Sequence, residues 1–366
     1  MRAANDTTRQ LLADLADGRG GIEKIWTADL MYDGERRLEG LQIDEPAIGW
    51  DMSRFVVASG AVPVVWSDVF GSSMIPREIG DWFSPFGAEL QVDCIIRAGR
   101  YEDRIPMARL IIDSVPDADD RRMLFQGIPF TAGESFTVNV ADRLAKIARD
   151  EFRAPTSAKS SSAWQEIQSV TRFPVIRSVP DAVVPSGIVY EGQRSAVVNK
   201  LYDLMGAWPH LTADGVLTAI PKAWGDPVDE IRGFVSAPVS MSAEQTYNSV
   251  VVEGKDDAGD PIYAFADITE GFLRVSNPGD SMSPFGRKTR RYQSEFLRTR
   301  QQCEEFAAGL LERSARRRGV RRTITEPFNP LREVGDVLIF DGGLARVSSL
   351  SHKGGQTMTT VDIPDR

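Results

Sequence analysis

The chain has 366 residues, 42% of them hydrophobic and 8% aromatic, which allows two to four domains with sizeable cores. Its formal net charge of −9 argues against a general nucleic-acid binder, because such a protein would present a basic surface. The only cysteines, Cys94 and Cys303, are too few for a disulfide framework or a cysteine-rich zinc site. We expect two free, buried thiols, which fits assembly in a reducing cytoplasm.

Residues 1–22 predict an N-terminal helical arm. Residues 8–16 form a short amphipathic pattern, and the glycines at 18, 20 and 21 end it. This start lacks the apolar stretch of a signal peptide. No run in the chain approaches the roughly 20 apolar residues of a transmembrane helix. We therefore expect neither a signal peptide nor a membrane anchor.

Residues 23–152 predict the first β-barrel domain with a terminal helix. Strand patterns occur at 25–32, 55–58, 62–68, 88–96, 107–114 and 136–140, and Asp33-Gly34 is typical of a hairpin turn. Short strands separated by glycine and proline favour a barrel or a sandwich. The pattern then changes to helical period over 141–152, where Leu144, Ala148 and Phe152 share one face.

Residues 153–234 predict a small α+β accessory domain. Ser162 precedes a helical pattern with Gln165 three residues later, the spacing of a capping box. A second helix is expected over 195–205, ended by Gly206. Strands at 208–212 and 216–220 flank Asp214-Gly215, which indicates a hairpin.

Residues 235–366 predict the second β-barrel domain. Strands are expected at 247–254 and 261–266, and a hairpin over 334–347 turns at 341–343. A helix is predicted over 299–318, because Thr299 and Gln302 have capping-box spacing. One apolar stripe then follows helical spacing: Cys303, Phe306, Ala307, Leu310, Leu311 and Ser314.

The window 287–322 is rich in arginine and has three interpretations. It could be a solvated helix face with its loop, or a protein interface that meets acidic neighbours, since arginine is enriched at interfaces. Nucleic-acid contact is the least favoured, because aromatic residues are nearly absent from the window. We expect no specific nucleic-acid binding.

Candidate catalytic residues are few. His210 and His352 are the only histidines, and we interpret both as structural or surface residues, with His352 in a polar loop. Two acidic clusters beside glycine or proline are read as solvated loops, and two tryptophans near a hairpin are read as core. These residues are Asp117, Asp119 and Asp120; Asp256, Asp257 and Asp260; and Trp208 and Trp224. The sequence thus predicts no catalytic, cofactor or metal site.

The order of motifs in the last third resembles the hub proteins of phage tails. The strand 247–254, its turn at 255–260, the loop 283–287, one amphipathic helix, and the turn from Pro330 to Gly335-Asp336-Val337 follow one another as in those hubs. The family comprises the contractile-phage baseplate hub and the N-terminal hub module of siphophage tail-associated proteins. The helix and Asp-Gly hairpin of the accessory domain are also similar.

This resemblance implies a non-enzymatic structural protein at the tail tip of a virion, assembled in the host cytoplasm. Three copies would form a ring in which each contributes two barrels, presenting a pseudo-sixfold face to hexameric rings. The implied partners are the chain itself, distal tail and tail-tube proteins, other tail-tip proteins and a tape-measure protein. Two alternatives remain open: a tail-associated cell-wall hydrolase that uses paired carboxylates, and a carbohydrate-binding tail module.

Overall fold

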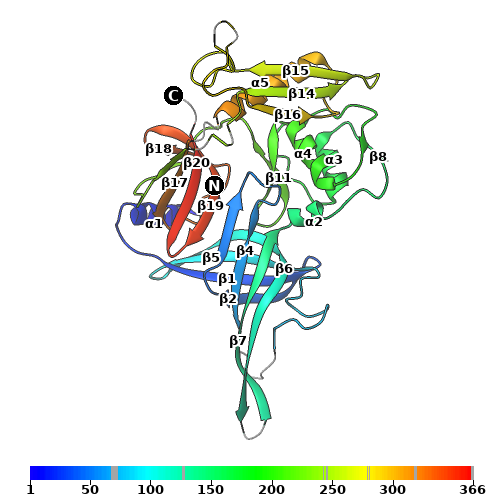
Figure 1. Cartoon of the computed structure of the whole chain (residues 1–366). Helices are drawn as coiled ribbons and strands as arrows, with labels where there is room; N and C mark the ends of the chain where they lie inside the picture. Colours follow the sequence, from blue (N-terminus) through cyan, green and yellow to red (C-terminus); the bar gives the residue numbers. More distant parts are fainter. Residues whose placement is uncertain are drawn as a thin grey trace.

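The computed structural model describes residues 1–66, 73–125, 128–241, 243–244, 246–277, 279, 281–316 and 320–363. The described chain is β-rich with few helices, as predicted (Figure 1). The N-terminal helix α1 (Asp6–Ala16) is present, and the Asn5 side chain accepts a hydrogen bond from the Thr8 amide. Strands from both ends of the chain join one 13-stranded sheet.

Six strands near the N-terminus pair in a closed circuit. β1 pairs with β2 and β5, β5 with β6, β6 with β7, β7 with β4, and β4 returns to β2 at Ile43 and Val64. Leu30, Val62 and Leu90 are almost fully buried inside it. The strands are β1 (Glu23–Tyr32), β2 (Glu35–Ile43), β4 (Ala58–Trp66), β5 (Ala88–Ala98), β6 (Tyr101–Phe125) and β7 (Ile128–Asp142).

The turn between β1 and β2 is the hairpin that Asp33-Gly34 predicts. Both residues have positive φ, 50° and 83°, which a two-residue type I′ turn requires. In β4, Gly60 permits a close approach of the neighbouring strand β3 (Ala47–Asp51), since a Cβ there would lie 2.1 Å from the Ala47 carbonyl oxygen. A side chain at Gly60 would push these two strands apart.

Strands β6 and β7 continue beyond the body as a projecting ribbon (Figure 1). β5 accompanies β6 as far as Ile111, and β4 accompanies β7 to Glu134. Past those points the described pairings join only β6 and β7. The prediction of a loop at Asp117, Asp119 and Asp120 is wrong, because these residues pair with β7 inside β6. Ladder pairing satisfies the backbone there whatever the side chains are.

A second group of strands extends the same sheet. β3 pairs with β19 through Trp50 and Leu350, and β19 continues to β20 and β17. Ile324, Val347 and Val361 are fully buried in this part of the core. The strands are β12 (Asp229–Glu230), β13 (Val239–Met241), β17 (Val320–Pro327), β18 (Val337–Phe340), β19 (Gly343–Lys353) and β20 (Gln356–Asp362). The β18–β19 hairpin is the one predicted over 334–347.

Residues 249–316 differ from the prediction, because they form a separate three-stranded sheet covered by a helix. β14 (Ser249–Lys255) lies between antiparallel β15 (Pro261–Asp267) and parallel β16 (Thr289–Gln293), under α5 (Arg300–Arg316). The sequence assigned 247–266 and 334–347 to one barrel, but these hairpins belong to different sheets. β14 is paired on both edges, and its apolar face packs against Cys303, Ala307 and Leu310 in a separate hydrophobic core.

The capping predicted for two helices is confirmed. The backbone N–H of Gln302 donates to Thr299 Oγ1 at 3.2 Å, and the Gln302 side-chain oxygen accepts from the backbone N–H of Thr299 at 3.1 Å. Ser162 Oγ accepts from the Gln165 amide at 3.2 Å at the start of α3 (Ala163–Thr171).

The accessory segment packs α3 against α4 (Arg194–Leu204) beside the hairpin of β10 (Ala207–Leu211) and β11 (Leu217–Pro221). A short pair, β8 (Thr156–Ser157) and β9 (Val189–Tyr190), lies alongside. The helix predicted over 141–152 is shorter. It is α2 (Leu144–Ala148), because strand pairing continues through Asp142.

Candidate functional site

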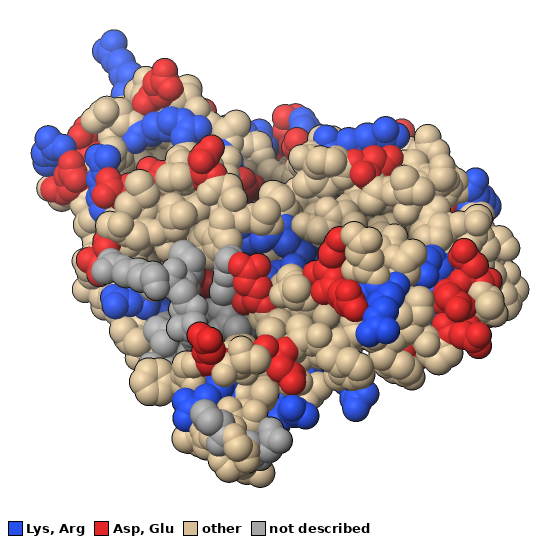
Figure 2. Space-filling model, turned by 90° about the horizontal axis from the view of Figure 1, so that it is seen from above, with Lys and Arg blue, Asp and Glu red and all other residues tan. Residues whose placement is uncertain are grey.

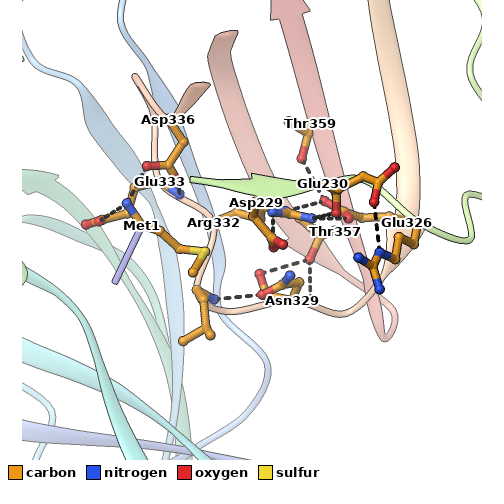
Figure 3. A network of polar contacts seen from close by, with 12 residues as sticks. Met1, Asp229, Glu230, Glu326, Asn329, Arg332, Glu333, Asp336, Thr357 and Thr359 are labelled. Carbon is orange, nitrogen blue, oxygen red and sulfur yellow. Dashed lines mark hydrogen bonds and ion pairs between the residues drawn. The ribbon is translucent and has the colours of Figure 1, made fainter. Parts of the chain in front are cut away.

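The turn that follows Pro330 carries a buried polar network (Figure 3). The Arg332 side chain is 2% exposed, and its Nε and Nη2 each donate to a Glu326 carboxylate oxygen at 3.0 Å. Its Nη1 donates to Asp229 Oδ2 at 2.6 Å. Burial alone would lower the pKa of Arg332, but the charges of Glu326 and Asp229 outweigh it and raise that pKa. One guanidinium therefore ties β12 and β17 to the turn.

The N-terminus is held by the same turn. The Met1 ammonium group contacts Asp336 and lies 3.2 Å from Glu333. The buried Arg2 side chain donates to the Pro330 carbonyl at 2.8 Å. The Pro330–Asp336 motif thus joins segments that are far apart in sequence, and its polar residues have a structural role.

The two histidines are held in different surroundings. His352 lies in β19, buried among the rings of Trp26, Trp50 and Phe328, with Nδ1 3.0 Å from Thr357 Oγ1. Burial lowers its pKa to about 3. The expectation of a polar loop is therefore wrong, because the flanking polar residues hid a strand position that faces the core.

His210 lies in β10, and burial lowers its pKa to about 4. Both histidines are neutral at pH 7, and we retain the interpretation of both as structural residues.

The second acidic cluster forms the turn between β14 and β15. The Asp256 carboxylate accepts the amides of Ala258 and Asp260 at 2.9 and 2.8 Å, so it stabilises its own loop. Among the described residues, no three His, Cys, Asp or Glu side chains are grouped so that they could hold a metal ion. In the same part of the chain, no helix is long and apolar enough to span a membrane. The two cysteines are free and buried.

Asp142 is a buried carboxyl group that the sequence did not single out. It lies where β7 meets α2 and accepts the amides of Ala58 and Leu144 at 2.7 and 2.9 Å. Burial raises its pKa to about 6, and these hydrogen bonds only partly oppose that shift. The folded state therefore keeps a proton that the unfolded chain releases near pH 4.

We expect the contribution of Asp142 to stability to fall as the pH rises from about 4 to about 6, because ionisation is easier in the unfolded chain. A carboxyl-carbon NMR titration of the folded protein should show a midpoint near 6 for Asp142 and an ordinary one for exposed carboxyls. A midpoint near 4 would contradict the role of burial.

A cleft lies where the three-stranded sheet, the accessory segment and the large sheet meet. Its volume is about 200 Å³, and Trp208, Trp224, Arg290, Arg313 and Arg346 are among the residues that line it. From above, the surface is hollowed near its centre, and basic side chains lie in the hollow (Figure 2). The two tryptophans, predicted to be core residues, are half-buried walls of this cleft.

Arg346 is fixed between these two rings. Its guanidinium carbon lies 4.5 Å from the Trp224 ring centre and 5.6 Å from that of Trp208. Nη1 and Nη2 donate to the carbonyls of Lys222 and Ala223 at 2.9 and 2.5 Å. No pattern in the sequence indicates this group, because its members come from separate segments.

Comparison with known proteins gives matches only at the level of structure. No protein-family model matches the chain, and no curated protein matches its sequence. A tail protein from Neisseria meningitidis MC58 superimposes with a TM-score of 0.58 at 11% identity, covering 92% of this chain and 96% of that one. The 43 kDa tail protein of prophage MuSo2 from Shewanella oneidensis gives 0.54 at 13% identity, over 93% and 99%.

The chain has the fold of phage tail proteins. The prophage tail protein gp18 from Listeria monocytogenes EGD-e also matches, with a TM-score of 0.50 at 10% identity over 93% of this chain and 95% of that one. The resemblance to phage tail proteins that the sequence predicts is thus confirmed, and at such identities it concerns the fold.

Proposed function

We propose that this chain is a structural virion protein, the hub at the tip or baseplate of a phage tail. The observation that carries the proposal is the extent of the structural likeness, which covers 92–93% of this chain and 95–99% of three tail proteins. A single shared module would match only part of each chain. The tail-tip position and the assembly in the host cytoplasm follow from the hub family that the sequence resembles.

In this proposal each chain contributes two barrels to a trimeric ring. The closed circuit of β1, β2, β4, β7, β6 and β5 supports the first, within residues 23–152. The second is built from β13 and β17–β20, within 235–366 and apart from the sheet-and-helix unit of 249–316, and β12 from the accessory segment pairs with its β18. Residues 1–22 form the arm and 153–234 the accessory domain. Three such chains would present six barrels to hexameric tail-tube or distal-tail rings.

Exposed apolar side chains support an assembled state. Tyr263 and Phe265 on β15 are 46% and 70% exposed, and Phe272 is 96% exposed. The alternation along β15 turns these two rings away from α5, and contiguous exposed apolar surface marks contacts with other chains. We propose distal tail, tail-tube, tail-tip and tape-measure proteins as the partners, besides the other two copies.

We propose no catalytic role. Asp117, Asp119 and Asp120 lie in a ladder-paired strand, and Asp256 and Asp260 stabilise a turn, so neither cluster needs a reaction to account for it. No feature of the described residues favours the hydrolase or the carbohydrate-binding module over the hub.

A reconstruction of the assembled tail tip tests the proposal. We expect three copies of this 40.4 kDa chain in one ring, each contributing two barrels. Six copies, or one barrel per copy, would refute the trimeric hub. Peptidoglycan cleavage by the purified chain, abolished by changing one acidic residue, would instead support the hydrolase.

A further inference from the structure

The cleft beside Trp208 combines aromatic rings with charged side chains, which is a composition typical of binding sites. We propose that it binds a carboxylate carried by an acidic segment of a partner protein. The site is assembled from β16, α5, the residues after β11, and β19. None of its lining residues belongs to the buried network of Arg332.

The charges that line the cleft suit one negative group. Among the lining residues that the structure describes, four cations face three carboxylates, one positive charge more than negative, on a chain whose formal net charge is −9. They are Lys222, Arg290, Arg313 and Arg346, against Asp51, Asp203 and Asp362. A carboxylate brings a single charge, whereas a phosphate group brings about −1.5 to −2 at pH 7. The balance therefore favours a carboxylate.

Two of the carboxylates are already engaged. Asp203 forms an ion pair with Lys222 and accepts the Tyr292 hydroxyl at 2.8 Å. Asp51 accepts the Ser53 amide at 2.8 Å and lies 3.5 Å from Arg54. Both oxygens of each carboxylate therefore already have a partner, and neither carboxylate can fully neutralise a further arginine.

Among these four cations, Arg313 is the one whose charge is least neutralised by its neighbours. Its guanidinium carbon lies 5.9 Å from the Phe306 ring centre, and within the described part of the chain no carboxylate forms an ion pair with it. Burial lowers its pKa, Asp203 opposes that shift, and Arg290 adds to it. A carboxylate at Arg313 would offset both the burial and the repulsion, and the planar guanidinium can bind it with two parallel hydrogen bonds.

The other cations are held in place before any ligand arrives. Arg346 is fixed between two tryptophan rings and by two carbonyls, and Arg290 donates to Ser314 Oγ at 3.2 Å. Such a preorganised site loses little side-chain freedom on binding.

The shape favours a segment of chain over a free ion. The cleft itself has a volume of about 200 Å³. It adjoins a second hollow of about 320 Å³, and five lining residues are common to both. Phe306 belongs to both hollows and gives them an apolar wall. One acidic side chain fits the cleft while its backbone neighbours follow the second hollow.

The test is a calorimetric titration of the full chain with the unlabelled peptide acetyl-Ala-Ala-Glu-Ala-Ala amide, against the same peptide with glutamine in place of glutamate. We expect the glutamate peptide to bind at least tenfold more tightly, about 1.4 kcal/mol. Arg313→Gln should remove that preference. Arg300→Gln is the matched control, since Arg300 is on the same helix, 79% exposed and paired with Glu304. It should change the affinity less than twofold.

Three results would overturn the proposal. Equal binding of both peptides would exclude carboxylate recognition, and an unchanged affinity in Arg313→Gln would place it elsewhere. Competition by inorganic phosphate at lower concentration than acetate would indicate a phosphate site. The assignment of the carboxylate to a tail protein rests on the proposed function. The peptide titration does not depend on that function. Failure of the cleft proposal can therefore be distinguished from failure of the trimeric-ring proposal.

Discussion

Replacing Arg332 with alanine should destabilise the chain by about 3–5 kcal/mol, because it leaves the Glu326 carboxylate buried without its partner. Glu326 is 3% exposed and receives two hydrogen bonds from Arg332. Asp229 and the Glu230 carbonyl lose a donor as well. Chemical denaturation followed by circular dichroism measures the loss.

The matched control is Arg232→Ala, in the segment that follows β12. Arg232 pairs with Glu230, but the two side chains are 59% and 45% exposed, so the pair contributes at most about 1 kcal/mol. If both variants unfold at the same denaturant concentration, the network in Figure 3 does not hold β12 and β17 to the turn.

Replacing Leu310 with aspartate should unfold the sheet-and-helix unit of residues 249–316. Leu310 is 5% exposed and packs in a core with Val250, Val252 and Ala307. The change removes buried apolar surface and places an unpaired charge there, at a cost of more than about 4 kcal/mol. Hydrogen exchange should accelerate in β14, β15 and α5 much more than in β1 or β5, because this unit has a core of its own.

Ala308→Asp is the control for this experiment, since it puts the same charge on the exposed face of the same helix. Its helix-propensity cost is below about 1 kcal/mol. Wild-type exchange rates in Leu310→Asp would show that the apolar stripe of α5 is not buried. Loss of protection throughout the chain would show that the two cores unfold together.

Local features of the fold could be predicted from the sequence. The caps at Ser162 and Thr299, the Asp33-Gly34 turn and the apolar stripe of α5 all depend on contacts between residues within a few positions of one another. Such contacts have fixed spacings and leave a pattern in the chain. The same patterns in order supplied the resemblance to tail proteins, and the structure confirms that resemblance.

Much less of the candidate site can be predicted from the sequence. Its cations lie at positions 222, 290, 313 and 346, and Trp208 and Trp224 were interpreted as core residues. The sequence shows the basic window that contains residues 290 and 313, but it leaves three interpretations of that window open. Only the packing of α5 and β16 beside β10 and β19 brings these side chains to one cleft, and no spacing in the sequence encodes that packing.

What the sequence determined by itself was the positions of the helices, the hairpin turns, the helix caps and the buried face of α5, since each depends on neighbouring residues. Only the tertiary structure decided that β14 leaves the large sheet, that β6 continues past Asp117 as a ribbon, and that His352 faces an aromatic core. The physical reason is that strand pairing joins backbones without regard to distance along the chain. A strand with an apolar face can therefore join several sheets, and the choice depends on which partner closes its core.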